Sequence, residues 1–245
     1  MPLIRRSFAL ALLAFVLSSP SFGQQPGVID FEQKADRLLF WNRHVRIEFQ
    51  ASSQGFRLAQ FHSLQHRQDF LAAALADKVP NLIQIVMKVD PSLQKRGETG
   101  TLVVGHLNAK TTSFRRTGDA STATLHLEWK DIDLKEDKAA MDVEVTVSLK
   151  ADDPLSYWRF NIKNRSIRYG VERVYFPVLN LAPIGEAKEN VYIYPAVRGR
   201  LVEDPFHQPP GYGDGVHQSG RYPAAFGMQF QALYNKETGA GLYLG

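Results

Sequence analysis

Polar and apolar residues alternate along most of this chain. His44–Phe49 alternates for three full repeats, which places Val45, Ile47 and Phe49 on one face of an extended strand. Ten further segments, rich in Val, Ile, Tyr, Phe and Thr and bounded by Gly, Pro, Asn or Asp, are typical of strands: Phe56–Phe61, Leu82–Val89, Thr101–Leu107, Thr122–Trp129, Met141–Leu149, Tyr157–Ile162, Val171–Phe176, Val191–Tyr194, Phe226–Tyr234 and Leu242–Leu244. Because helices do not alternate with these strands, the pattern predicts an all-β fold, an antiparallel β-sandwich of sheets packed face to face.

One segment departs from the period of two. In Gln68–Ala76, the apolar residues Phe70, Leu71, Ala74 and Leu75 have the spacing of one helical face. A short helix is favoured here over a loop with a single helical turn. The fold is therefore expected to contain at most one short helix.

Turn residues separate the predicted strands. Ala151–Pro154 joins two long strands, and Pro154 excludes both a helix and a ladder donor at that point. In Asn235–Gly239, Gly239 is free to take a positive φ, as a short hairpin loop requires.

The N-terminus has the features of an export signal. Arg5 and Arg6 precede the apolar run Phe8–Leu17, and Ser21-Phe22-Gly23 provides small residues at a cleavage site. We expect removal of residues 1–23, a short linker over 24–35, and a single β domain over 36–245. The alternative is a buried or anchoring N-terminal helix, although the apolar run is too short to span a bilayer.

Composition limits the classes of function. The 245 residues are 44% apolar and 22% charged, as expected of one folded domain. The chain has no cysteine, which excludes disulfides, a thiolate nucleophile and a Cys-based zinc site. No later segment is apolar enough to cross a membrane. This combination predicts a bacterial periplasmic or secreted protein, with no membrane association after the signal is removed.

Charge gives no indication of a nucleic-acid partner. Without the signal the chain is nearly neutral, and basic pairs such as Arg115-Arg116 and Lys95-Arg96 are scattered. No glycine-rich phosphate loop opens a helix, and no Gly-x-Ser-x-Gly elbow is present. We expect no nucleic acid and no cofactor.

The region from Glu203 to Pro223 is the candidate functional loop. It is rich in proline and glycine, and a loop of about twenty residues inside a domain is either functional or disordered. Aromatic rings stack on the C–H faces of sugars, while guanidinium, imidazole and carboxylate groups bond to hydroxyls. The residues of these types, and hence the candidate carbohydrate contacts, are His207, Tyr212, Asp214, His217, Arg221 and Tyr222. Alternatively, Tyr222 packs the loop onto the sheets and the histidines face solvent.

The same loop allows two interpretations as part of an enzyme. A glycosidase needs two flanking carboxyl groups, but Glu203, Asp204 and Asp214 are of the kind that forms turns in Gly/Pro-rich loops, so no catalytic pair is assigned. A mutarotase needs a general base and a general acid, for which Glu203 with His207 or His217 has the right chemistry. The histidines lack the spacing of a helical metal site, so no metal is expected.

Isolated features add little. Trp41, Trp129 and Trp158 fall within strand patterns and are predicted to pack in the core or between sheets. Asn164-Arg165-Ser166 is a glycosylation sequon, a short motif that is common by chance.

Two groups of strand and turn motifs resemble known carbohydrate-active proteins. Asp153–Asn164, followed by Val171–Pro177, resembles a recurring motif of galactose-mutarotase-like supersandwiches. Tyr222-Pro223, Met228–Tyr234 and Gly239–Tyr243 resemble bacterial proteins similar to endo-α-N-acetylgalactosaminidases, in which a supersandwich precedes a (β/α)₈ barrel.

The resemblance implies a sandwich that supports a catalytic barrel and contributes at most a loop to the sugar site. In that family the catalytic carboxylates lie on the barrel, so the resemblance assigns no catalytic residue here. Gly241–Gly245 is expected to be a strand cut in mid-course before such a barrel; a genuine C-terminal strand is the alternative. The expected function is thus an accessory carbohydrate-associated domain of an exported glycoside-hydrolase-like protein. The alternatives are a stand-alone mutarotase-type epimerase and a non-catalytic polysaccharide-binding module.

Overall fold

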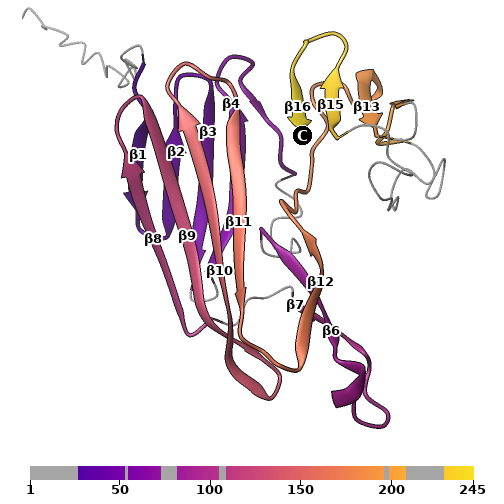
Figure 1. Ribbon diagram of the computed structural model, residues 1–245. Coiled ribbons are helices and arrows are strands. Elements are labelled where there is room, and N and C mark those ends of the chain that lie inside the picture. The colour runs from indigo at the N-terminus through magenta and orange to yellow at the C-terminus, as the bar shows by residue number, and fades with distance from the viewer. Residues whose placement is uncertain (1–26, 53–54, 73–81, 105–108, 196–198, 208–228) are drawn as a thin grey trace, which may run out of the picture.

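The computed structural model describes residues 27–52, 55–72, 82–104, 109–195, 199–207 and 229–245, and these form antiparallel sheets (Figure 1). The all-β prediction is confirmed. The first sheet has the order β1-β2-β3-β4-β5 and consists of Asp30–Lys34, Arg37–Trp41, Val45–Ser52, Gly55–Ser63 and Gln68–Asp69. The second has the order β11-β10-β9-β8 and consists of Ser156–Asn164, Asp137–Lys150, Thr122–Leu134 and Thr111–Gly118.

Two smaller sheets complete the described part. One has the order β12-β6-β7, from Tyr169–Tyr175, Gln84–Val89 and Thr101–Val104. The other has the order β14-β13-β15-β16, from Arg200–Glu203, Asn190–Tyr194, Gln231–Asn235 and Gly241–Leu244. Two single 3₁₀ turns, η2 at Pro91–Leu93 and η3 at Ala187–Glu189, are the helical elements among the described residues, within which no helix has the length and apolarity needed to cross a bilayer.

The main core lies between the two larger sheets, which face each other in Figure 1, and continues onto the β12-β6-β7 sheet through residues such as Ile85, Met87 and Tyr169. Alternation along β9 buries Leu125, Leu127 and Trp129 and leaves the intervening polar residues on the outer face. Ring contacts connect the layers: Phe56 lies edge-on to Trp129 with centroids 5.4 Å apart, and Phe49 is 5.8 Å from Trp158. Trp129 and Trp158 are therefore core and intersheet residues, as predicted.

A second, smaller core supports the β13–β16 sheet. Its buried residues are Phe70, Ile184, Leu233, Ala240 and Leu242. The predicted turn at Asn235–Gly239 is confirmed, with Gly239 at φ +68°. Buried asparagines fasten this region, because Asn190 and Asn235 both donate to the carbonyl of Ile184, at 2.9 and 2.6 Å.

The helix predicted over Gln68–Ala76 is wrong for its described residues. Gln68 and Asp69 pair with β4 as strand β5, and Leu71 forms an isolated bridge with Leu181. Phe70 is buried against Phe61, with ring centroids 5.9 Å apart. A short helix is marginal by itself, so pairing with a neighbouring strand prevails; residues 73–76 lie outside the described ranges.

The segment expected to be a linker contains structure. Asp30–Lys34 forms β1 and pairs with β2 in full register, from Asp30–Trp41 to Lys34–Arg37. Its apolar residue Phe31 packs against the main core, 6.1 Å from the ring of Phe114. The proposed signal over residues 1–23 lies outside the described part of the chain.

Candidate functional site

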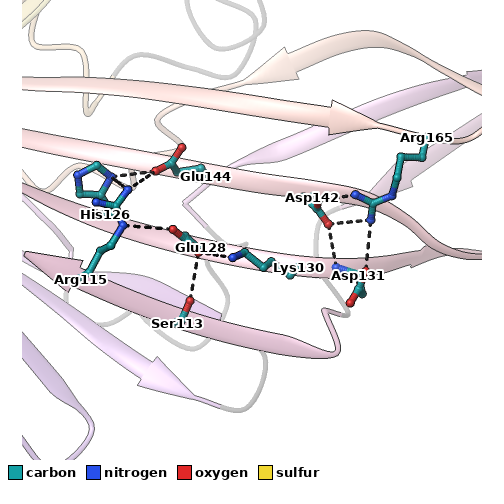
Figure 2. A network of polar contacts seen from close by, with 9 residues as sticks. All are labelled: Ser113, Arg115, His126, Glu128, Lys130, Asp131, Asp142, Glu144 and Arg165. Carbon is teal, nitrogen blue, oxygen red and sulfur yellow. Dashed lines mark hydrogen bonds and ion pairs between the residues drawn. The ribbon is translucent and has the colours of Figure 1, made fainter.

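The outer face of the β8–β11 sheet carries a polar network (Figure 2). Its side chains are the outward-facing residues of three adjacent strands, brought together by register: Glu128 on β9 lies opposite Ser113 on β8 and Glu144 on β10. One row along, His126 lies opposite Arg115. Residues from three consecutive strands thus form one patch, which we call the polar face and define as Ser113, Arg115, His126, Glu128, Lys130 and Glu144.

Arg115 holds the two opposed carboxylates together. Like charges directly across a ladder repel each other, but the Arg115 guanidinium lies 3.5 Å from Glu128 Oε1 and 3.3 Å from Glu144 Oε1. Arg115 is half exposed, whereas the Glu128 side chain retains only 17% of its accessible surface. The polar face therefore presents the partly covered carboxylate of Glu128 beside the accessible guanidinium of Arg115.

His126 links Arg115 and Glu144. Its Nδ1 lies 2.8 Å from Arg115 Nη2 and 2.8 Å from Glu144 Oε1, and its Nε2 lies 3.1 Å from Thr117 Oγ1. Arginine only donates, so an unprotonated Nδ1 accepts from Arg115, while a protonated Nδ1 donates to Glu144. Nδ1 can bond to only one of Arg115 and Glu144 at a time, so the other of the two keeps hydrogen-bonding capacity for a ligand.

The charge state of Glu128 favours binding over proton transfer. The hydrogen bond from Lys130, 2.9 Å away, holds the pKa of Glu128 below its usual value, and bonds from Arg115 and Ser113 act in the same direction against partial burial. A glycosidase acid needs the opposite, a raised pKa. The polar face thus offers the ionised carboxylate of Glu128 and the guanidinium donor of Arg115, a set suited to hydroxyl groups.

A second cluster lies farther along the same face. Arg165 binds the carboxylate of Asp142 through two nitrogens and lies 3.4 Å from Asp131 Oδ1 (Figure 2). The hydrogen bond from Arg165 lowers the pKa of Asp142 to about 2. This pair fastens the β9–β10 hairpin to the end of β11, because Arg165 also donates to the carbonyl of Ala139.

The Asp142 pair predicts a pH-dependent contribution to stability. The folded pKa of about 2 lies below the ordinary 3.8, so the contribution is present above about pH 4 and is lost as the pH falls toward 2. With solvent screening, we expect Asp142→Asn to lower the unfolding free energy by about 1 kcal/mol at pH 6 and by much less at pH 2.5. Urea unfolding at the two pH values measures this.

Asp152→Asn is the control for that experiment. Asp152 is exposed and forms a surface pair with Arg43 at 3.4 Å. Its substitution should change stability by a few tenths of a kcal/mol. An Asp142→Asn effect that is equally large at both pH values would contradict the assigned role of Arg165.

The predicted loop residues fall mostly outside the described ranges: Tyr212, Asp214, His217, Arg221 and Tyr222 all do. His207 is exposed, and its Nδ1 lies 2.7 Å from Asp204 Oδ1 within a turn after β14. Glu203 is also exposed and lies 3.9 Å from Lys236 Nζ. The carboxylate paired with His207 is therefore Asp204, not the Glu203 considered from the sequence.

Sequence reasoning missed the polar face. In the sequence Arg115 belongs only to a scattered basic pair, and no motif distinguishes His126, Glu128 or Glu144. The available signal was the run of polar residues at alternate positions of Thr122–Trp129 and Met141–Leu149, which shows an outward face but not the register across strands. Among the described residues, no group of three or more histidine and acidic side chains has the geometry of a metal site.

No protein-family model matches the chain, and no curated protein matches it.

Proposed function

We propose that this chain is an accessory, carbohydrate-associated domain of an exported glycoside-hydrolase-like protein, and that catalysis resides on a (β/α)₈ barrel outside it. In this proposal the two stacked larger sheets are the body of a galactose-mutarotase-like β-supersandwich. Residues 1–23 are removed on export to the periplasm or the medium. The domain supports the barrel and contacts polysaccharide through the polar face.

The polar face is the observation that carries the proposal. Its paired carboxylates lie beside Arg115, so its groups can accept from and donate to sugar hydroxyls, and the lowered pKa of Glu128 favours hydrogen bonding by that residue over proton transfer. The surrounding sheet extends the polar surface, because Tyr157, Arg159 and Asn161 of β11 lie opposite Ser148, Thr146 and Glu144 of β10. A broad, charge-balanced sheet face suits an extended neutral polysaccharide.

A series of aromatic contacts from the core to the surface supports the proposal that the domain packs against the barrel. Ring contacts run from Trp158 to Phe176 at 6.4 Å and from Phe176 to Phe160 at 5.1 Å. Phe160 lies on β11, which forms one edge of its sheet, and it is 44% exposed. We assign this exposed ring to the surface that the barrel covers.

The mutarotase alternative has one supporting observation. Asp204 and His207 form a carboxylate–imidazole pair with the chemistry of a general acid and base. Both belong to one local turn rather than to two elements that enclose a sugar. The accessory role is therefore preferred, and the alternative becomes one outcome of the test below.

Glycan binding by the purified chain tests the proposal. We expect retention on an array of immobilised neutral oligosaccharides, and we expect Arg115→Ala and Glu144→Gln to weaken it about tenfold, as the loss of one or two hydrogen bonds to charged groups does. Lys138→Ala is the matched control, because Lys138 is an exposed lysine that pairs with Asp133 near the turn between β9 and β10.

Three outcomes decide between the functions. Loss of binding in the two polar-face variants, with the control unchanged, supports the proposal. Equal binding by all four proteins, or no retention of the original chain, overturns the role of the polar face. Conversion between sugar anomers, followed by polarimetry and abolished by His207→Ala, would instead establish the mutarotase alternative.

A further inference from the structure

A cavity of about 510 Å³ lies where the end of β6, the start of β12 and the connection between β11 and β12 meet. In Figure 1 these elements lie at the end of the molecule away from β13, β15 and β16. The lining includes Lys88, Asp90, Asn164, Ile167, Gly170 and Glu172. Its volume falls within the roughly 300–1,000 Å³ of small-molecule sites, and its residues do not belong to the polar face.

The cavity has a clear origin in the sheet. Gly170 lies opposite Lys88 in the β12–β6 ladder, and a Cβ at Gly170 would meet only the Lys88 carbonyl oxygen, at 4.0 Å. Two positions farther along, Glu172 is the extra residue of a register shift between Val171 and Arg173. A β-bulge of this kind redirects a side chain. The lack of a side chain at Gly170 and the redirected side chain of Glu172 therefore open the cavity together.

Two charged groups of the cavity, Lys88 and Glu172, form no hydrogen bond or ion pair in the described part of the chain. The Nε of Arg168, also in the lining, is buried without an acceptor among the described residues. Because its Nη2 is paired with Glu98, Arg168 belongs to the frame of the cavity rather than to its free groups.

Other polar residues of the lining are already hydrogen-bonded within the chain and form the frame of the cavity. Asn164 Nδ2 donates to the Tyr169 carbonyl at 2.7 Å, so the sequon asparagine is held within the turn. The Asp90 carboxylate accepts from the Ser92 backbone at 2.8 Å. Ile167, 88% exposed, provides an apolar rim. A frame of hydrogen-bonded residues with free polar groups beside an aliphatic rim suits a small polar ligand.

We propose that this cavity binds a neutral polyhydroxylated ligand, a single sugar unit. Arg168 is paired with Glu98, so the cation Lys88 stands against the carboxylates of Asp90 and Glu172; this set disfavours an anion and provides both donors and acceptors for hydroxyl groups. Each sugar hydroxyl donates and accepts, so it can satisfy Glu172 and Lys88 alike, while the ring C–H groups pack on Ile167. The choice of a sugar as the ligand rests on the proposed function, whereas the cavity and its free groups are observed independently of it.

Amide NMR of the ¹⁵N-labelled chain, titrated with glucose, galactose, mannose and N-acetylglucosamine, tests the inference. We expect shifts at Lys88, Gly170 and Glu172 with at least one of these sugars. Gly170→Phe fills the cavity on a strand position that accepts a side chain, and we expect it to weaken binding about tenfold or more. Val103→Phe, at an exposed position of β7 opposite Val86 and outside the cavity lining, is the matched control and should bind normally.

The outcomes separate this inference from the proposed function. Cavity shifts that disappear in Gly170→Phe but persist in Arg115→Ala support the inference, whatever the polysaccharide array shows. Shifts confined to the polar face, or no shifts at the cavity with any of the four sugars, overturn it while leaving polysaccharide binding to be decided by its own variants. Tighter binding of glucuronate than of glucose would overturn the assignment of a neutral ligand.

Discussion

Replacing Gly55 with alanine is expected to lower the unfolding free energy by about 3 kcal/mol or more, through overpacking and backbone strain together. Gly55 begins β4 at φ +116°, a conformation that residues with a side chain rarely adopt. A Cβ there would lie 1.8 Å from Nε1 of Trp129, the largest fully buried side chain of the main core. Chemical denaturation followed by tryptophan fluorescence measures the loss.

Gly239→Ala separates the two causes. Gly239 has φ +68° and open space around its Cβ position, so only the backbone term applies. We expect it to cost about 1 kcal/mol. If Gly55→Ala fails to fold, Trp129→Phe in the same chain, which shortens the buried ring system, should restore part of the stability. Equal losses at Gly55 and Gly239 would show that the contact with Trp129 is not the cause.

Replacing Asn42 with alanine should be nearly as damaging. Asn42 is fully buried, and its Nδ2 donates to the carbonyls of Lys150 and Asp153 at 2.7 and 2.8 Å. Its Oδ1 accepts from the backbone of His44 and Val45 at 2.8 and 2.9 Å. Removal leaves these backbone groups unsatisfied between the two sheets, so we expect a loss of about 3 kcal/mol in urea unfolding.

Asn42→Asp adds a pH test of the same contacts. An ionised carboxylate would face two carbonyl oxygens, whereas a protonated one can still donate, so the folded pKa of the new group should lie above its unfolded value. The variant should therefore approach the original stability at low pH and fall away from it as the pH rises. Asn161→Ala, at an exposed position of β11, is the control and should change stability by less than about 0.5 kcal/mol. A pH-independent loss in Asn42→Asp would contradict the donor role of Nδ2.

The period of two determined most of the strands. In Met141–Leu149 and Thr122–Trp129 the alternate apolar residues are buried in the main core, because a half-buried strand must place successive side chains on opposite faces. The turn at Asn235–Gly239 could also be predicted from the sequence, since a positive φ favours glycine. These properties are local, and a single sequence contains them.

Tertiary structure decided what depends on pairing. Phe70 has helical spacing, yet its segment joins β4 and Leu181, since neighbouring strands satisfy the backbone better than a marginal helix. The same reason explains the polar face and the cavity: Arg115 meets Glu144, and Gly170 meets Lys88, only through strand register. Register is set by the packing of whole sheets, so the sequence by itself determined which residues face outward, and only the fold decided which of them meet.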